Sequence, residues 1–249
     1  MKPAAPFRLA ARLAKLAAVL ARPRLARGLR HGVVAGVEHL ALLHRLAPAT
    51  VIDVGAHRGQ FALAVRAACP TARIESLDPQ PAPAARYRRL FAHDSGVRLH
   101  SVAAGAAPDT ATLHLSARSD SASLLPLTPA QAAIFPGTGP AGTRRVPVAR
   151  LDALLAPEDL VPPVLLKLDV QGGELAALQG AAGWLDRVDW VYAECSEIAL
   201  YEGQPLRTEI AAWLAARGFH AVGRFNAVHR RGHGVVQADV LFTRPQAPR

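Results

Sequence analysis

The chain has 249 residues, 51% of them apolar, which is enough for the core of one α/β domain with extensions. Its two cysteines, Cys69 and Cys195, lie far apart without a CxxC or Cys/His cluster, which argues against a structural zinc site or a disulfide framework and fits a reducing cytoplasm. The net charge is +10, but residues 1–50 hold nine basic residues against one acid, so a nucleic-acid-binding surface over the whole body is poorly supported.

Residues 1–45 form a basic extension ahead of the main domain, which we expect to span residues 46–249. The extension is rich in Ala, Leu and Arg, with basic residues at near-helical spacing. No uninterrupted apolar run reaches the ~18 residues that cross a bilayer, and basic residues interrupt any secretory signal core. The interpretations left open are a basic amphipathic helix on an anionic membrane surface, a transit peptide, and a helical extension that packs on the body through Leu9, Leu13, Leu16 and Leu20.

Beyond the extension, short apolar runs alternate with segments of helical periodicity. This alternation predicts an α/β fold with a doubly wound, mostly parallel sheet of seven strands. Because a short turn-rich segment joins the last two strands, we expect them to form an antiparallel C-terminal hairpin. The expected strands are 50–55, 72–78, 97–103, 163–169, 189–195, 219–225 and 238–244, and the expected helices are 60–68, 81–93, 173–185 and 205–218.

The first of these strands runs into a turn with two glycines, VIDVGAHRGQF at residues 51–61. The chain has no GxxxxGK[ST] loop, and the turn lacks the middle glycine of GxGxxG, which disfavours a dinucleotide. Asp53 lies two residues before Gly55, where an acid suits a cationic ligand, and Asp78 ends the second strand, where a carboxylate suits ribose hydroxyls. Together the two acids favour S-adenosyl-L-methionine, which carries a sulfonium and no phosphate; ordinary capping and turn roles are the alternative.

Residues 104–150 interrupt the strand–helix alternation. They are rich in Gly, Pro, Ser and Thr and contain one short alternating stretch, TLHLS at 112–116. A long insertion of this kind in a compact domain is typical of a functional lid. We therefore expect an irregular segment that covers the acceptor side of the site. The alternative is a surface loop without a role in the site.

Four segments resemble, in order, the motifs of the FkbM-type S-adenosyl-L-methionine-dependent methyltransferases: VIDVGAHRGQF, ESLDP (75–79), LKLDVQGGELAALQGA (166–181) and YAECS (192–196). The resemblance covers about residues 46–244. It implies a class I, Rossmann-like methyltransferase fold and methyl transfer to an oxygen of a sugar or a polyketide-type secondary metabolite. The chain departs from the family pattern Asp-Val-Glu-Gly at Gln171, which leaves the role of that position open.

The carboxyl ends of the strands place the candidate site residues along one rim of the sheet. Lys167 and Asp169 are two apart on a strand and face the same way, and a buried lysine there needs an acidic partner, for which Asp169, Glu174 and Glu194 are candidates. For a hydroxyl acceptor, Asp169 is the first candidate general base and Glu194 the second, with Lys167 orienting either or steadying an oxyanion; a structural ion pair is the alternative. The residues expected to bind the cofactor are Asp53, Gly55, Ala56, His57, Gly59, Asp78, Pro79 and Ala103.

Other functions are less consistent with the sequence. The ten histidines include no convincing metal-ligand spacing, so no metal is expected. No [DNS]PP[YFW] motif follows the fourth strand, and neither cysteine fits cytosine C5 chemistry, so we expect a small-molecule or glycan hydroxyl acceptor and no nucleic acid. A methyltransferase acting on nucleic acid and a non-catalytic member that binds cofactor or glycan are kept as alternatives; Gln171 favours the second. We expect a cytoplasmic protein, with the extension as a contact to the inner membrane face.

Overall fold

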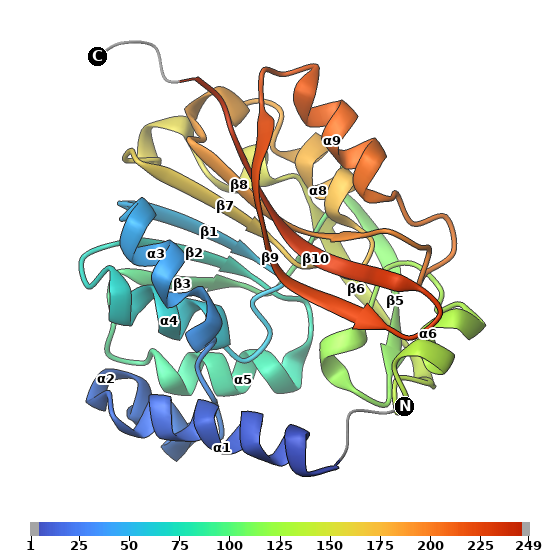
Figure 1. Cartoon of the computed structure of the whole chain (residues 1–249). Helices are drawn as coiled ribbons and strands as arrows, with labels where there is room; N and C mark the ends of the chain where they lie inside the picture. The colour runs from blue at the N-terminus through green and yellow to red at the C-terminus, as the bar shows by residue number, and fades with distance from the viewer. Residues whose placement is uncertain (1–4, 246–249) are drawn as a thin grey trace.

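The computed structural model describes the backbone of residues 5–245 and the side chains of residues 13–245. Its centre is a seven-stranded sheet in the order β3-β2-β1-β7-β8-β10-β9, with helices on both faces (Figure 1). β10 is antiparallel to both of its neighbours, whereas the pairs from β3 to β8 are parallel. The predicted doubly wound sheet with a C-terminal hairpin is therefore confirmed. The strands are β1 (Thr50–Val54), β2 (Arg73–Leu77), β3 (Val97–His100), β7 (Val164–Leu168), β8 (Trp190–Ser196), β9 (His220–Arg230) and β10 (Gly234–Thr243).

The two faces of the sheet bury separate apolar clusters. One cluster joins the sheet to the helices of the first half of the chain, and the other joins it to the helices of the second half. β1 and β7 are buried along their whole length, which explains why their sequences are nearly continuous apolar runs. The helices of the first face are α3 (Leu40–Leu46), α4 (Gln60–Ala68) and α5 (Pro81–Leu90), and those of the second are α7 (Leu151–Leu154), α8 (Glu174–Gly180) and α9 (Arg207–Ala215).

Strand register places a row of polar side chains on the face covered by α4. Asp53 of β1 pairs with Lys167 of β7, and Lys167 pairs with Tyr192 of β8. Directly paired residues point to the same side of a sheet, so these three side chains are neighbours in an otherwise apolar layer. Farther along β8, Glu194 pairs with Asp239 of β10. The row ends at the carboxyl edge of the parallel strands, where ligands bind in open α/β sheets.

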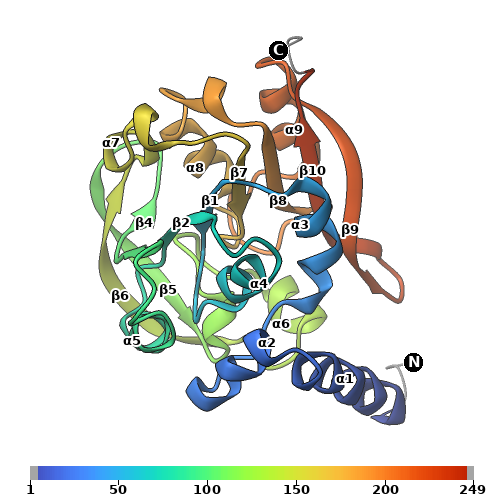
Figure 2. The same cartoon turned by 90° about the vertical axis from the view of Figure 1, so that its left-hand side faces the viewer.

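The expectation that residues 104–150 are irregular is wrong. β5 (Asp109–Ser116) and β6 (Pro140–Ala149) form an antiparallel ladder, and β6 also pairs with β4 (Ala103–Ala104). The alternation seen in TLHLS continues through the ladder, so that Leu113, Val146 and Val148 bury one face against Ala103. The insertion also contains η3 (Ser119–Ser121) and α6 (Pro129–Ile134). Figure 2 shows β5 and β6 on the opposite side of the molecule from β9.

The N-terminal extension is helical and packs against the main domain, but not through the predicted leucines. Leu13, Leu16 and Leu20 of α1 (Ala5–Leu20) are 56%, 39% and 57% exposed, whereas Val19 on the inner side is buried. The predicted packing is therefore wrong for these three, because the leucine stripe points away from the body; the side chain of Leu9 lies outside the described residues. We call Leu13, Leu16 and Leu20 the exposed leucines of α1.

The rest of the extension continues the core. α2 (Pro23–Ala26) opens on a proline at its first position, a favoured start, and buries Leu25. The one-turn segments η1 (Arg27–His31) and η2 (Val37–His39) lead to α3, which crosses the predicted boundary at residue 45. Between residues 5 and 245, no helix has the length and apolar character needed to span a bilayer.

Candidate functional site

A cavity of about 670 Å³ opens at the carboxyl ends of β1, β2, β7 and β8. Its wall draws on four parts of the chain: the extension, the strand ends, the insertion and the β9–β10 hairpin. Nine of the predicted site residues line this cavity: Gly55, Ala56, His57, Asp78, Pro79, Ala103, Lys167, Asp169 and Glu194. Asp53 and Gly59 are not among the described lining residues.

The glycine turn is shaped by close packing of two strand ends. Gly55 has φ +85°, and a Cβ there would lie 1.8 Å from the carbonyl oxygen of Asp169. Gly59, with φ +89°, precedes the first residue of α4, and a Cβ there would lie 2.9 Å from the Phe91 ring. Only glycine allows this backbone together with this approach. The turn consequently brings its own amides and the end of β7 together at the floor of the cavity.

Asp78 is held in place by the turn it faces. Its Oδ2 accepts a hydrogen bond from the backbone N–H of His57 at 2.9 Å, and its Oδ1 accepts one from the N–H of Gln80 at 2.8 Å. The residue is 3% exposed, and burial raises the pKa of Asp78 to about 6 in spite of these two bonds. Each carboxylate oxygen keeps a lone pair for a ligand hydroxyl. Asp78 is thus an oriented acceptor for a pair of hydroxyl groups.

An apolar wall lies next to Asp78. Val102, Ala103 and Leu113 line the cavity there, supplied by the segment that follows β3, by β4 and by β5. The insertion also contacts the glycine turn, since the Oγ of Ser119 lies 2.9 Å from Nε2 of His57. An oriented carboxylate beside an apolar slot fits a nucleoside, with the ribose on the acid and the base in the slot. These residues therefore suit the adenosine part of S-adenosyl-L-methionine.

Burial, and after it the charge of Arg58, lowers the pKa of His57 to about 4. The imidazole is consequently neutral at neutral pH, with one nitrogen as a donor and the other as an acceptor. Its Nε2 faces the hydroxyl of Ser119, and its Nδ1 lies 3.3 Å from Nε2 of Gln60, which can donate to it. His57 thus links the glycine turn to the insertion that covers it.

Asp53 and Lys167 form a buried ion pair, in which Lys167 lines the cavity and Asp53 lies behind it. Asp53 is fully buried, its two carboxylate oxygens have no hydrogen-bond partner among the described residues, and Oδ1 lies 3.3 Å from Nζ of Lys167. The same Nζ lies 3.4 Å from Oδ2 of Asp169 and 5.5 Å from the centre of the Phe61 ring. Burial works against the charge on Lys167, but Asp169 and Asp53 together raise the pKa of this lysine above its usual value. Asp53 is thus a partner that the sequence did not indicate for Lys167.

Gln171 bridges the two carboxyl groups at the ends of β7 and β8. Its Nε2 donates to Oδ1 of Asp169 at 2.9 Å and to Oε2 of Glu194 at 2.6 Å, and its Oε1 accepts from the hydroxyl of Tyr201 at 2.8 Å. Gln171 adopts φ +56°, and the loop around it is held by Glu174, which accepts from the N–H groups of residues 170 and 172. Glu174 therefore holds this loop, and among the described residues the ion pairs of Lys167 are with Asp53 and Asp169 and not with Glu174.

The bridged pair carries unequal charge. Burial, and then the neighbouring charge of Asp169, raises the pKa of Glu194 well above its usual value. For Asp169 burial acts in the same direction, but Lys167 and the bond from Gln171 outweigh it and lower its pKa. Asp169 is therefore the member that loses its proton first as the pH rises, and Glu194 the one that keeps its proton to higher pH. An ionised carboxylate with a low pKa orients a hydroxyl well but is a weak proton acceptor.

Sequence reasoning missed the far end of the cavity, which is lined by His39, Asn226 and Asp239. These are single polar residues in the extension and the hairpin, and no local motif marks them. A second cavity of about 350 Å³ shares Asp169 and Glu194 with the first. Across the described part of the chain, no cluster of His, Cys, Asp or Glu side chains is arranged to hold a metal ion.

Comparison with known proteins gave one family and several solved structures. The model for the methyltransferase FkbM domain matches residues 53–221. No curated protein sequence matched the chain.

Three of the similar solved structures are methyltransferases whose names give different substrates. A proposed tRNA (m1A22) methyltransferase from Streptococcus pneumoniae, solved with S-adenosyl-L-methionine, is 14% identical, with 84% of this chain and 73% of that chain covered and a TM-score of 0.47. Precorrin-6y C5,15-methyltransferase from Geobacter metallireducens is 11% identical, with 83% of this chain and 87% of that chain covered and a TM-score of 0.44. An rRNA methylase from Streptococcus thermophilus is 11% identical, with 83% of this chain and 94% of that chain covered and a TM-score of 0.44.

Proposed function

The chain belongs to the FkbM methyltransferase family, whose members use S-adenosyl-L-methionine, and from that premise we propose that it methylates a hydroxyl oxygen of a glycan or of a polyketide-type metabolite. The observation that carries the choice of acceptor is the charge of the cavity. Six acidic and two basic side chains are found among its described lining residues. Both basic ones are paired, Lys167 with Asp53 and Asp169 and Lys15 with Glu38.

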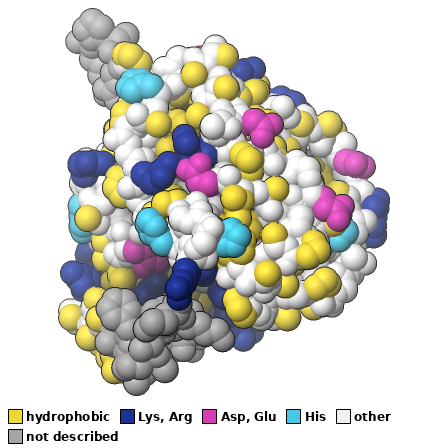
Figure 3. Space-filling model, turned by 45° about the vertical axis from the view of Figure 1, so that its right-hand side comes forward, with side chains coloured by type: hydrophobic (Ala, Val, Ile, Leu, Met, Phe, Trp, Pro, Cys, Tyr) yellow, Lys and Arg dark blue, Asp and Glu magenta, His cyan; other side chains and the backbone are white. Residues whose placement is uncertain are grey.

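An acidic cavity favours a neutral acceptor rich in hydroxyl groups over a phosphate-bearing one. Carboxylates accept hydrogen bonds from sugar hydroxyls, whereas they repel the phosphates that dominate nucleic-acid binding. On the face drawn in Figure 3, Lys and Arg side chains are scattered among apolar and uncharged ones and form no continuous basic patch. Both features support a glycan or metabolite acceptor over nucleic acid.

The residues present fit the cofactor. Asp78 would hold the ribose hydroxyls, the apolar wall at Ala103 the adenine, and the turn at Gly55 the amino-acid part, with Asp169 at the acceptor side. Bound S-adenosyl-L-methionine supplies a methyl carbon that is already activated by its sulfonium leaving group. The protein contributes orientation, because an acceptor oxygen held in line with the breaking bond gains most of the available acceleration. We assign to Asp169 a hydrogen bond that orients the acceptor through a hydroxyl next to the one that is methylated, and to Lys167 the position of Asp169.

Calorimetric titration with S-adenosyl-L-methionine and with S-adenosyl-L-homocysteine tests the cofactor part. We expect both to bind the wild-type protein and binding to collapse in Asp78→Ala. Because Asp78 also holds two backbone amides, Ala103→Phe, which fills the apolar wall, is the second variant. Asp109→Ala, at an exposed acid on β5, is the matched control.

Transfer of labelled methyl to acid-extracted glycans, metabolites and total RNA tests the acceptor part. We expect label in the glycan or metabolite fraction. Label in RNA alone would replace this proposal by the nucleic-acid alternative. Binding of both ligands without transfer to any fraction would favour a non-catalytic member, for which the Gln171 departure is the only sequence argument.

A further inference from the structure

A hydrogen-bonded row connects the hairpin to the extension across the far end of the cavity. The Tyr192 hydroxyl donates to Oδ2 of Asp239 at 3.0 Å and lies 3.1 Å from Nδ1 of His39. Asn226 on β9 donates through Nδ2 to the same Oδ2 at 2.7 Å and to the Tyr192 oxygen at 3.2 Å. All of these residues except Tyr192 line the cavity, and three of them lie outside residues 53–221.

Counting protons in this row fixes the tautomer of His39. The Tyr192 hydroxyl has one hydrogen, which goes to Asp239, so its oxygen can only accept from its other neighbours. Asn226 donates to one lone pair, and Nδ1 of His39 lies closer to the tyrosine oxygen, at 3.1 Å, than to the Asn226 amide nitrogen, at 3.5 Å, so we assign the second lone pair to a hydrogen on Nδ1. In a neutral imidazole with a hydrogen on Nδ1, the other nitrogen carries a free lone pair. Nε2 of His39 is therefore a proton acceptor.

The ring of His39 lines the cavity and is held there by two aromatic contacts. It packs edge-on against Phe61 and Tyr192, with centroid distances of 5.1 and 5.7 Å, and its side chain is 14% exposed. A Cβ at Gly36, which also lines the cavity, would lie 2.8 Å from Cδ2 and 3.5 Å from Nε2 of His39. Within the described part of the chain, Nε2 makes no hydrogen bond, and its nearest carboxylate oxygen, on Glu38, is 4.0 Å away.

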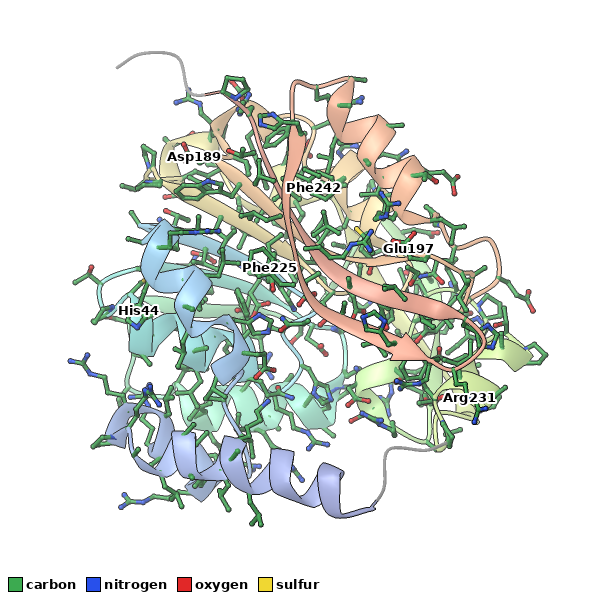
Figure 4. All side chains as sticks on the ribbon, viewed as in Figure 1. His44, Asp189, Glu197, Phe225, Arg231 and Phe242 are labelled. Carbon is green, nitrogen blue, oxygen red and sulfur yellow. The ribbon has the colours of Figure 1, made fainter. Side chains whose placement is uncertain are left out.

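The backbone of the hairpin is bent to complete the row. Asn226 has φ +50°, in the left-handed region, and lies where the β9–β10 register shifts between Gln237 and Asp239. Such positions cost about 1–3 kcal/mol and persist where the surroundings impose them. The bulge turns the Asn226 amide inward onto Tyr192 and Asp239. Figure 4 shows Phe225, the preceding residue, extending from β9 over the sheet.

We propose that His39 is the general base of this methyltransferase, with Tyr192 and Asp239 holding its ring and tautomer. The inference rests on the proposed hydroxyl methylation. In the step, the acceptor O–H bond breaks, its electron pair becomes the new C–O bond, and the proton goes to Nε2 of His39, while the C–S pair leaves with the sulfur. Asp239 and Tyr192 then stabilise the imidazolium through Nδ1.

The other candidates for this role are less suited to it. Asp169 is already bound by Lys167 and Gln171, and Glu194 accepts a hydrogen bond from the same Gln171 amide. The charged groups around His39 are Glu38 on its own segment, Lys15 of α1 bound to Glu38, Asp239 of β10, and Lys167 and Asp169 at the end of β7. Burial outweighs the carboxylates and lowers the pKa of His39, so the ring is neutral at neutral pH and available as a base.

Nitrogen NMR of the ¹⁵N-histidine-labelled full chain tests the tautomer without any acceptor. We expect His39, assigned from the signal lost in His39→Asn, to be the neutral form with hydrogen on Nδ1 at pH 7. Tyr192→Phe should change its tautomer ratio or its pKa, whereas the exposed His44 should not respond; Figure 4 shows His44 on α3, away from Phe225 and the hairpin. A hydrogen on Nε2, or a charged ring at pH 7, would overturn the proposal.

His39→Asn is the informative variant for activity, because the asparagine amide can still donate to Tyr192 but nothing replaces Nε2. We expect its affinity for S-adenosyl-L-methionine to stay within threefold of wild type, while methyl transfer to the active extract falls about 100-fold or more and the acidic limb of the pH profile disappears. His44→Asn is the matched control. Transfer at the wild-type rate would overturn the base, and loss of cofactor affinity would assign His39 to the cofactor instead. If wild-type protein transfers no label, it is the proposed function that fails.

Discussion

The carboxyl group of Asp78 should make cofactor affinity depend on pH in a narrow range. Its pKa is raised to about 6 by burial, and the ribose hydroxyls are expected to bind its ionised form. On lowering the pH from 7 to 5, the ionised fraction falls from about nine-tenths to about one-tenth, so the affinity for S-adenosyl-L-homocysteine should fall about tenfold, or about 1.4 kcal/mol. His57 is already neutral across this range because its pKa is lowered to about 4.

The stability of the cofactor-free protein should move in the opposite direction. A free aspartate titrates near ~3.9, so the fold raises the pKa of Asp78 and disfavours its charged form. That penalty amounts to about 3 kcal/mol above pH 6, shrinks as the pH falls through the folded pKa, and is gone below about pH 4. Between pH 7 and 5 the free energy of unfolding should therefore rise by about 1 kcal/mol from this group.

Calorimetry from pH 5 to 8 and denaturant unfolding over the same range measure the two trends. Asp78→Asn should remove the pH dependence of binding and weaken binding at pH 7 about 10- to 100-fold, since hydrogen bonds to a charged group contribute about 1.5–3 kcal/mol. Asp109→Asn is the control. Glu174, whose pKa is raised to about 7, also titrates here, but it does not line the cavity and should leave the binding trend unchanged. Affinity that is constant from pH 5 to 7 in wild type would refute this reasoning.

Three further outcomes follow from the structure. Gly55→Ala should lower the free energy of unfolding by about 3 kcal/mol or more because of its contact with the Asp169 carbonyl, against about 1 kcal/mol for Gly218→Ala, where nothing lies within 4 Å; equal losses in denaturant unfolding would contradict this. Gln171→Glu should place a third carboxyl beside Asp169 and Glu194 and destabilise the protein increasingly as pH rises, which thermal melts from pH 5 to 8 would show. On the interpretation that α1 rests on an anionic membrane, serine at the exposed leucines of α1 should reduce co-sedimentation with anionic vesicles without changing cofactor affinity; equal sedimentation of wild type and variant would contradict that interpretation.

The sheet and the place of Asp78 at the cavity were predictable because their signals are local. β1 and β7 are buried on both faces, so their apolar runs identify them as central strands. Asp78 follows a strand directly, and parallel strands end at one edge, so its place at the cavity could be inferred without knowing any long-range contact.

The remainder depends on contacts between distant parts of the chain. The β5–β6 ladder is partly exposed, and its strands lack the continuous apolar runs of the main sheet, so composition suggested a loop. Asp53 became the partner of Lys167 only through strand register. His39 and Tyr192 are 153 positions apart, and nothing near either of them indicates the other.

The division of the cavity also bears on the acceptor. The groups that fit the cofactor lie inside residues 53–221, whereas His39, Asn226 and Asp239 come from segments before and after that match. A family that shares a cofactor needs its cofactor half in common, but each acceptor needs its own wall. In this chain the far wall is built by an extension and a bulged hairpin, which are joined by the contacts of Tyr192 with His39 and with Asn226. The acceptor specificity should therefore reside in these two segments, and exchanges within them should change the acceptor while leaving S-adenosyl-L-homocysteine affinity intact.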